Sequence, residues 1–147
     1  MMLRGRIFKD SDTGKWWAAE APTVGVYTQG TSRKDAFEML ADAVESGVNR
    51  KGFKVTVSEA GGEDVVIEAS DPAALALYVL KVQRSHHGLS LADVAEKLGA
   101  NSRNAYARYE QGGTVPTITK FVELLAVVAP DLVLKLEPRA LTGARLK

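Results

Sequence analysis

The stretch Arg84–Gly99 reads RSHHGLSLADVAEKLG and decides how the C-terminal half of the chain folds. Gly88 ends one helix, because glycine readily adopts the left-handed conformation that closes helices. Ser90 can cap a second helix, and Asp93 stands three residues later, close to the spacing of a capping box. Gly99 ends this second helix after about two turns. The stretch therefore predicts two helices joined by a short turn.

The residues on both sides extend this helical pattern. Ser70-Asp71-Pro72 predicts the start of the first helix, because proline is favoured at the first helical position. Ser102 can cap a third helix that runs through Glu110, and Thr117 can cap a fourth that ends before Pro130. The fourth helix has apolar residues at helical spacing: Phe121, Leu124, Leu125 and Val128. Two short helices joined by a tight turn are typical of a helix-turn-helix, whose second helix lies in the DNA major groove.

Individual residues strengthen this interpretation. Arg84, the run Gly88–Gly99, Tyr109-Glu110-Gln111-Gly112 and Val115-Pro116-Thr117 together resemble the Xre/Cro-type helix-turn-helix over residues 84–125. The resemblance implies that Ala95 lets two helices cross closely and that Glu110 pairs with Arg84. Leu91 departs from the family, in which a glutamine that contacts the DNA backbone is common. The turn at residues 98–102 is one residue longer than usual, which could tilt the third helix.

The third helix carries the side chains that we expect to contact DNA. Arg103, Asn104 and Arg108 fall on its exposed face, whereas Tyr106 points inward. Arginine can bond guanine O6 and N7, and asparagine can bond adenine N6 and N7; the alternative is that all three are merely solvated. Helix N-termini and loops supply weaker candidates for phosphate contacts. The expected DNA-binding residues are Ser90, Asn101, Ser102, Arg103, Asn104, Arg108, Thr114 and Lys120.

The N-terminal half has a different pattern. Residues 3–7, 16–20 and 24–28 predict three strands of an antiparallel meander, separated by the turn at residues 10–14 and by Pro22. Thr31 or Ser32 can cap a helix whose apolar face contains Ala36, Phe37, Leu40, Val44 and Val48, and Gly47 and Gly52 mark its exit. Residues 54–58 and 65–68 predict one or two further strands. We expect a small sheet with one helix on one face.

One helix leaves the second face of this sheet open to solvent or to a partner. Trp16 and Trp17 are neighbours on a strand and therefore point to opposite faces. We expect one indole in the core and the other exposed, either beneath a loop or at an interface.

The segments GKWWAAEAP at residues 14–22 and YTQGTSRKDA at residues 27–36 resemble the N-terminal domain of HicB-type antitoxins, over about residues 3–46. The resemblance implies a degraded ribonuclease-H-like fold that binds and blocks a small HicA-type ribonuclease toxin. The residues expected to contact this toxin are Trp16, Trp17 and Tyr27.

Composition excludes several classes of protein. The 147 residues include no cysteine, which excludes disulfides, thiol nucleophiles and cysteine-bound zinc. His86 and His87 are the only histidines and diverge on a helix, so we expect no metal site and no cofactor. No apolar run approaches the roughly 18 residues of a membrane span, and the N-terminus lacks a signal-peptide pattern, so we expect a cytoplasmic protein with no membrane partner.

Charge differs between the two halves. Residues 1–70 hold nine basic and eleven acidic side chains, whereas residues 71–147 hold ten and seven. A basic C-terminal half is the direction expected for contact with nucleic acid. The carboxylates of Asp10, Asp12, Glu20 and the first helix do not converge as two-metal catalysis requires. We therefore expect a binding protein and not an enzyme.

The predicted fold class is α+β: a toxin-binding domain at residues 1–69 and an all-α DNA-binding domain at residues 70–130. Residues 131–147 would form a terminal strand, paired across a dimer or added to the first sheet, and a basic tail. The predicted function is that of an antitoxin that neutralises a ribonuclease and represses its own operon as a homodimer or higher oligomer. The alternative is a stand-alone transcriptional regulator whose N-terminal domain senses a small molecule.

Overall fold

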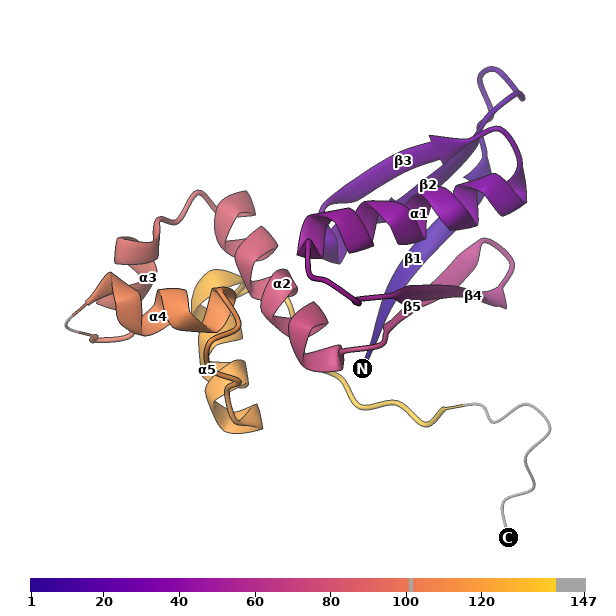
Figure 1. Ribbon diagram of the computed structural model, residues 1–147. Helices are drawn as coiled ribbons and strands as arrows, with labels where there is room; N and C mark the ends of the chain where they lie inside the picture. Colours follow the sequence, from indigo (N-terminus) through magenta and orange to yellow (C-terminus); the bar gives the residue numbers. More distant parts are fainter. Residues whose placement is uncertain (101, 140–147) are drawn as a thin grey trace, which may run out of the picture.

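A computed structural model describes residues 1–100 and 102–139 (Figure 1). The N-terminal half is a five-stranded antiparallel sheet of order β3-β2-β1-β5-β4. Its strands are β1 (Met2–Lys9), β2 (Trp17–Ala21), β3 (Val26–Gly30), β4 (Val55–Gly61) and β5 (Asp64–Ala69). The helix α1 (Arg33–Val48) lies across one face of the sheet, and the short 3-10 helix η1 (Pro22–Val24) joins β2 to β3. The predicted meander and the single helix are confirmed, and the one or two further strands that we expected are two; the third strand begins at Val26 because Val24 lies in η1.

Alternation along the strands separates a covered face from an open face. Leu3, Gly5 and Ile7 of β1 are buried beneath α1, whereas Arg4 and Arg6 face away from it and are exposed. The helix presents Ala36, Leu40 and Val44, all fully buried, to this covered face. Residues 20 and 27 are cross-strand partners on the open face.

The start of α1 follows the sequence prediction, but its end does not. Ser32 caps the helix by accepting from the backbone N–H of Asp35 at 3.0 Å. Gly47 was expected to mark the exit, yet it lies inside α1, and Asn49 closes the helix at a φ of 49°. Gly47 is needed for another reason: a Cβ there would collide with the Tyr78 hydroxyl and lie 2.6 Å from Tyr78 Cζ.

Four helices make up the C-terminal half: α2 (Pro72–His86), α3 (Leu91–Lys97), α4 (Arg103–Glu110) and α5 (Ile118–Val128). Each begins at the predicted cap, because Asp71, Ser90, Ser102 and Thr117 all accept a backbone N–H of the first turn. The Ser90–Asp93 capping box is complete. The four predicted helices are confirmed.

Helix α2 packs against both halves (Figure 1). The Gln83 amide donates to the Thr23 carbonyl at 2.8 Å, which joins α2 to η1. Tyr78 contacts α1 at Gly47, and a single hydrophobic cluster extends from β1 to α5. The two halves therefore share one core, with α2 between them.

The segment after α5 differs from the prediction. Residues 131–139 contain no strand, and the five strands of the sheet do not include them. The proposed addition of a sixth strand to the first sheet is therefore wrong for the described chain, because the segment packs against the open face through side chains and makes no ladder. Pairing across a dimer stays a prediction. The basic tail at residues 140–147 lies outside the described residues.

Candidate nucleic-acid interface

Helix α4 presents the expected polar face to solvent. Arg103, Asn104 and Arg108 are exposed, whereas Tyr106 and Ala107 are buried against the other helices of the C-terminal half, which we call the helical unit (α2–α5). Among the described residues, neither Arg103 nor Arg108 forms an ion pair. Their guanidinium groups therefore have all their donors available for a ligand, and α4 has no exposed carboxylate beside them.

An ion pair fixes the end of α4 to α2. Arg84 Nε donates to Glu110 Oε1 at 2.6 Å, and Arg84 Nη2 donates to Glu110 Oε2 at 3.0 Å. Arg84 Nη1 also donates to the Leu89 carbonyl at 2.8 Å, so the same side chain holds the turn before α3. The hydrogen bond to Glu110 raises the pKa of Arg84 above its ordinary value. The pairing that the Xre/Cro resemblance implied is present.

Tyr106 lies beside this pair in the core. Its side chain is fully buried, and within the described residues its hydroxyl has no hydrogen-bond partner of acceptable geometry. Burial, followed by the charge of Glu110, raises the pKa of this hydroxyl above its ordinary range. Tyr106 therefore stays neutral and anchors the inner face of α4.

Serine caps stand at the N-termini of both central helices. Ser102 accepts from the Asn104 N–H at 3.2 Å, so this exposed hydroxyl stands at the positive end of α4. The Ser90 N–H, in contrast, donates to the Asp93 carboxylate at 2.7 Å. An acidic group at this position repels a phosphate, so α3 offers a weaker anion site than α4.

The remaining candidates for phosphate contact lie after α4. Thr114 is exposed in the loop between α4 and α5. Lys120 lies in the first turn of α5, and its Nζ is held by Glu123 at 3.1 and 3.2 Å. Lys120 must therefore leave or share this carboxylate to reach a phosphate. Asn101 lies outside the described residues.

Arg50 is a neighbour of this surface that sequence reasoning missed. It lies in the loop between α1 and β4, and its guanidinium contacts Gly112 just after α4. Arg50 Nη1 also lies 3.7 Å from Asp71 Oδ2 at the start of α2. The contact joins residues 62 positions apart in the sequence, so no local pattern could have revealed it.

The structure separates the residues expected to contact a toxin. Trp17 is half-buried and packs against the core on the helix-covered side of β2, together with Ala19 and Ala21. Tyr27 is 68% exposed on the open face, opposite Glu20. Trp16 is 39% exposed and precedes β2. Trp17 is the inner indole, although only half-buried, and Trp16 is the exposed one, but Trp16 lies outside the strand and Trp17 and Tyr27 do not share a surface.

The two histidines lie at the end of α2. Their rings meet edge to face, and His87 Nε2 lies 3.0 Å from Asp131 Oδ1, while its Nδ1 lies 2.9 Å from the Gln83 carbonyl. The residues that the structure describes contain no group of three metal-ligating side chains. In the same residues, no helix is long and apolar enough to cross a membrane.

Comparison with known proteins bears on the helical unit. A helix-turn-helix family model of the Xre/Cro type matches residues 80–128, the part of the chain that contains α3, α4 and α5 and the end of α2. No HicB or toxin–antitoxin family model matches the chain. No curated protein and no solved structure gives a significant match. The family match confirms the helix-turn-helix and indicates that the protein is a DNA-binding transcriptional regulator.

Proposed function

We propose that this protein is a HicB-like antitoxin, which represses its own operon through the helix-turn-helix and blocks a small ribonuclease toxin through the N-terminal sheet. The first half of this proposal builds on the helix-turn-helix match. The second half builds on the resemblance of residues 3–46 to the N-terminal domain of HicB-type antitoxins. For the N-terminal sheet and its helix we propose a degraded ribonuclease-H-like fold. Both activities consist of binding, and we propose no catalysis.

Repression follows from the geometry of α4. A recognition helix inserts its N-terminal residues into the major groove, where Arg103 and Asn104 at the start of α4 can bond base edges. Arg108 lies one turn further along the same exposed side. The Ser102 hydroxyl and the Thr114 loop are available for the flanking phosphates. A two-fold dimer would repeat these contacts on a second half-site.

Blocking of a toxin is supported by the open face of the sheet, which is the single observation that carries this half of the proposal. No described helix covers this face, and Tyr27 stands on it with 68% of its surface exposed. Charged groups continue along the same face from Tyr27: Glu20 is its cross-strand partner, and Arg6 lies 3.5 Å from Glu20 and 2.5 Å from Glu63. Tyrosine and arginine are enriched at protein interfaces.

The decisive experiment is co-expression of the full chain with a neighbouring gene that encodes a chain of under 100 residues, followed by co-purification and a ribonuclease assay. We expect a stable complex in which the small partner has lost its ribonuclease activity. Tyr27→Asp should weaken the complex at least about 10-fold, the loss typical of a truncated interface anchor. Val115→Asp is the matched control, because Val115 is 66% exposed but lies in the helical unit.

Two results would overturn the toxin-binding half. One is a ribonuclease that remains active in the presence of the chain. The other is a purified chain that binds DNA but whose affinity for DNA changes with a small molecule, which would favour the ligand-sensing regulator. Cleavage of RNA by the chain itself would overturn the proposal of a binding protein.

A further inference from the structure

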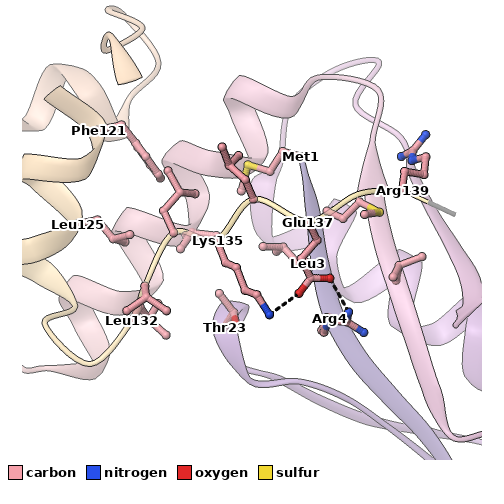
Figure 2. Close-up of a pocket in the computed structure, with 16 residues that line it drawn as sticks. Met1, Leu3, Arg4, Thr23, Phe121, Leu125, Leu132, Lys135, Glu137 and Arg139 are labelled. Carbon is pink, nitrogen blue, oxygen red and sulfur yellow. Dashed lines mark hydrogen bonds and ion pairs between the residues drawn. The ribbon is translucent and has the colours of Figure 1, made fainter. Parts of the chain in front are cut away.

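The segment that follows α5 lies across the junction of the two halves (Figure 2). Residues 132–137 and Arg139 line a groove of about 590 Å³ together with Met1, Leu3, Phe121 and Leu125, and the segment runs between the helices and the sheet. Glu137 pairs with Arg4 of β1 at 2.9 Å, and Arg139 pairs with Glu68 of β5. These ion pairs position the segment beside the sheet.

The side chains of this segment are unusually exposed for their type. Val133 is 86% exposed and Leu136 is 89% exposed, while Leu134 is 46% exposed. Val133 and Leu136 therefore have almost no cover in the single chain, and exposed aliphatic side chains of this kind often mark an interaction site.

The backbone of the segment is also unpaired. The last backbone hydrogen bond that involves it, within the described residues, is donated by the Leu132 N–H to the Ala129 carbonyl at 3.0 Å. From residue 133 to residue 139, no backbone group of the described chain bonds to another backbone group. An extended segment with free N–H and C=O groups is a template for pairing with another strand.

We propose that residues 133–139 pair antiparallel with the same residues of a second copy of this chain, with Leu136 opposite Leu136. Alternation then places Leu134 and Leu136 on one face of the two-stranded ribbon, and Val133, Lys135 and Glu137 on the other. The partner strand is a second copy of this segment, because its lysine and glutamate are complementary across an antiparallel pair of identical strands.

The charges select this register. A two-fold axis perpendicular to the ribbon and centred on Leu136 places Lys135 of each copy opposite Glu137 of the other. A centre at Lys135 would oppose two lysines, and a centre at Glu137 would oppose two glutamates. A centre at Leu134 would oppose Asp131 and Glu137. Like charges directly opposite destabilise a strand pair, whereas opposite charges stabilise it. A centre at Val133 would place Asp131 opposite Lys135, but Asp131 lies in the turn closed by the hydrogen bond from the Leu132 N–H to the Ala129 carbonyl. The Leu136 centre is therefore favoured.

This inference deepens the proposed function, because it supplies the two-fold pairing that repression of a two-half-site operator would use. It does not depend on a toxin. The dimer can therefore be measured on the purified full chain without DNA and without a partner, and its failure would leave the toxin-binding experiment unaffected.

The test is a charge exchange followed by sedimentation equilibrium. Lys135→Glu opposes two pairs of acidic groups in the dimer and should raise its Kd about 10-fold or more. Lys135→Glu combined with Glu137→Lys restores opposite charges across the axis and should bring the Kd back to within about two-fold of an Arg4→Ala reference. The Arg4→Ala reference is needed because Glu137→Lys also removes the ion pair with Arg4. Leu136→Asp should leave only monomer.

The matched controls are Lys34→Glu and the exchange Lys34→Glu with Glu38→Lys, which alter an exposed ion pair on α1 and should not change the Kd. Far-UV circular dichroism on every variant confirms that the fold is retained. A wild-type chain that stays monomeric, a Leu136→Asp variant that stays dimeric, or a charge exchange that fails to restore the dimer would each overturn the proposal.

Discussion

The guanidinium of Arg84 and the carboxylate of Glu110 form a bidentate ion pair that joins α2 to the last residue of α4. Their side chains are only 15% and 7% exposed, so water screens the pair weakly. The pair ties the far end of the recognition helix to the helix that both halves share. The orientation of α4 therefore depends on the core of the whole chain.

Arg84→Ala should destabilise the protein by about 3–5 kcal/mol, because it leaves the buried Glu110 carboxylate without its partner. Urea denaturation measures this loss. The double variant Arg84→Met/Glu110→Leu should lose less, since it leaves no buried charge behind. Equal losses in the single and the double variant would show that the cost comes from packing and not from the unpaired charge.

Gly47→Ala should destabilise the native chain, although alanine favours a helix over glycine by about 1 kcal/mol. The reason is the collision of the new Cβ with Tyr78. In a Tyr78→Ala background, the same substitution should stabilise the protein by up to about 1 kcal/mol. Thermal unfolding of the four chains of this cycle measures the sign. Destabilisation of the same size in both backgrounds would exclude Tyr78 as the cause.

Asp93 should make the free energy of unfolding depend on pH in the acidic range. Hydrogen bonds from Ser90, first from its backbone N–H, hold the pKa of the Asp93 carboxyl below its ordinary value. Because the pKa is lowered in the folded state, the stabilisation is complete above the unfolded pKa of about 3.9 and is lost as the pH falls through the folded pKa. Asp93→Asn should therefore flatten the fall in stability below about pH 4. Denaturation between pH 2.5 and 6 is the measurement, with the exposed Asp42→Asn as control.

Arg103→Ala should relax the sequence preference of DNA binding and cost about 1–3 kcal/mol at the preferred site. Selection of bound duplexes from a random pool, followed by titration of the preferred site, measures both effects. Lys81→Ala removes an exposed cation from α2 and should leave the sequence preference unchanged. An unaltered preference in Arg103→Ala would remove Arg103 from the base-reading residues.

Glu123→Gln should strengthen the binding of all DNA sequences alike, because it frees the Lys120 ammonium from its carboxylate partner. Lys120→Ala should weaken binding uniformly and reduce the salt slope by about one. Titrations of one duplex at several salt concentrations separate the two effects. A Lys120→Ala variant with the native salt slope would exclude a phosphate contact by this residue.

Local patterns predicted most of the secondary structure. Asp71-Pro72, the Ser90–Asp93 box, Ser102 and Thr117 all start helices as expected, because a cap acts on backbone groups within the same turn. The end of α1 was wrong, because glycine can mark either a helix end or a close contact, and only the position of Tyr78 distinguishes the two. The strand expected after residue 130 does not form within the described single chain, because an alternating pattern does not by itself supply a neighbouring strand to pair with.

The sequence by itself determined the helix-turn-helix, the exposed face of α4 and the pairing of Arg84 with Glu110, since these depend on caps, helical period and a recognisable set of residues. Tertiary structure alone decided which contacts join the two halves of the chain. It placed α2 in a core shared with the sheet and Arg50 against Gly112. These relationships join residues far apart in the chain, and they arise only when apolar surfaces of both halves are buried together.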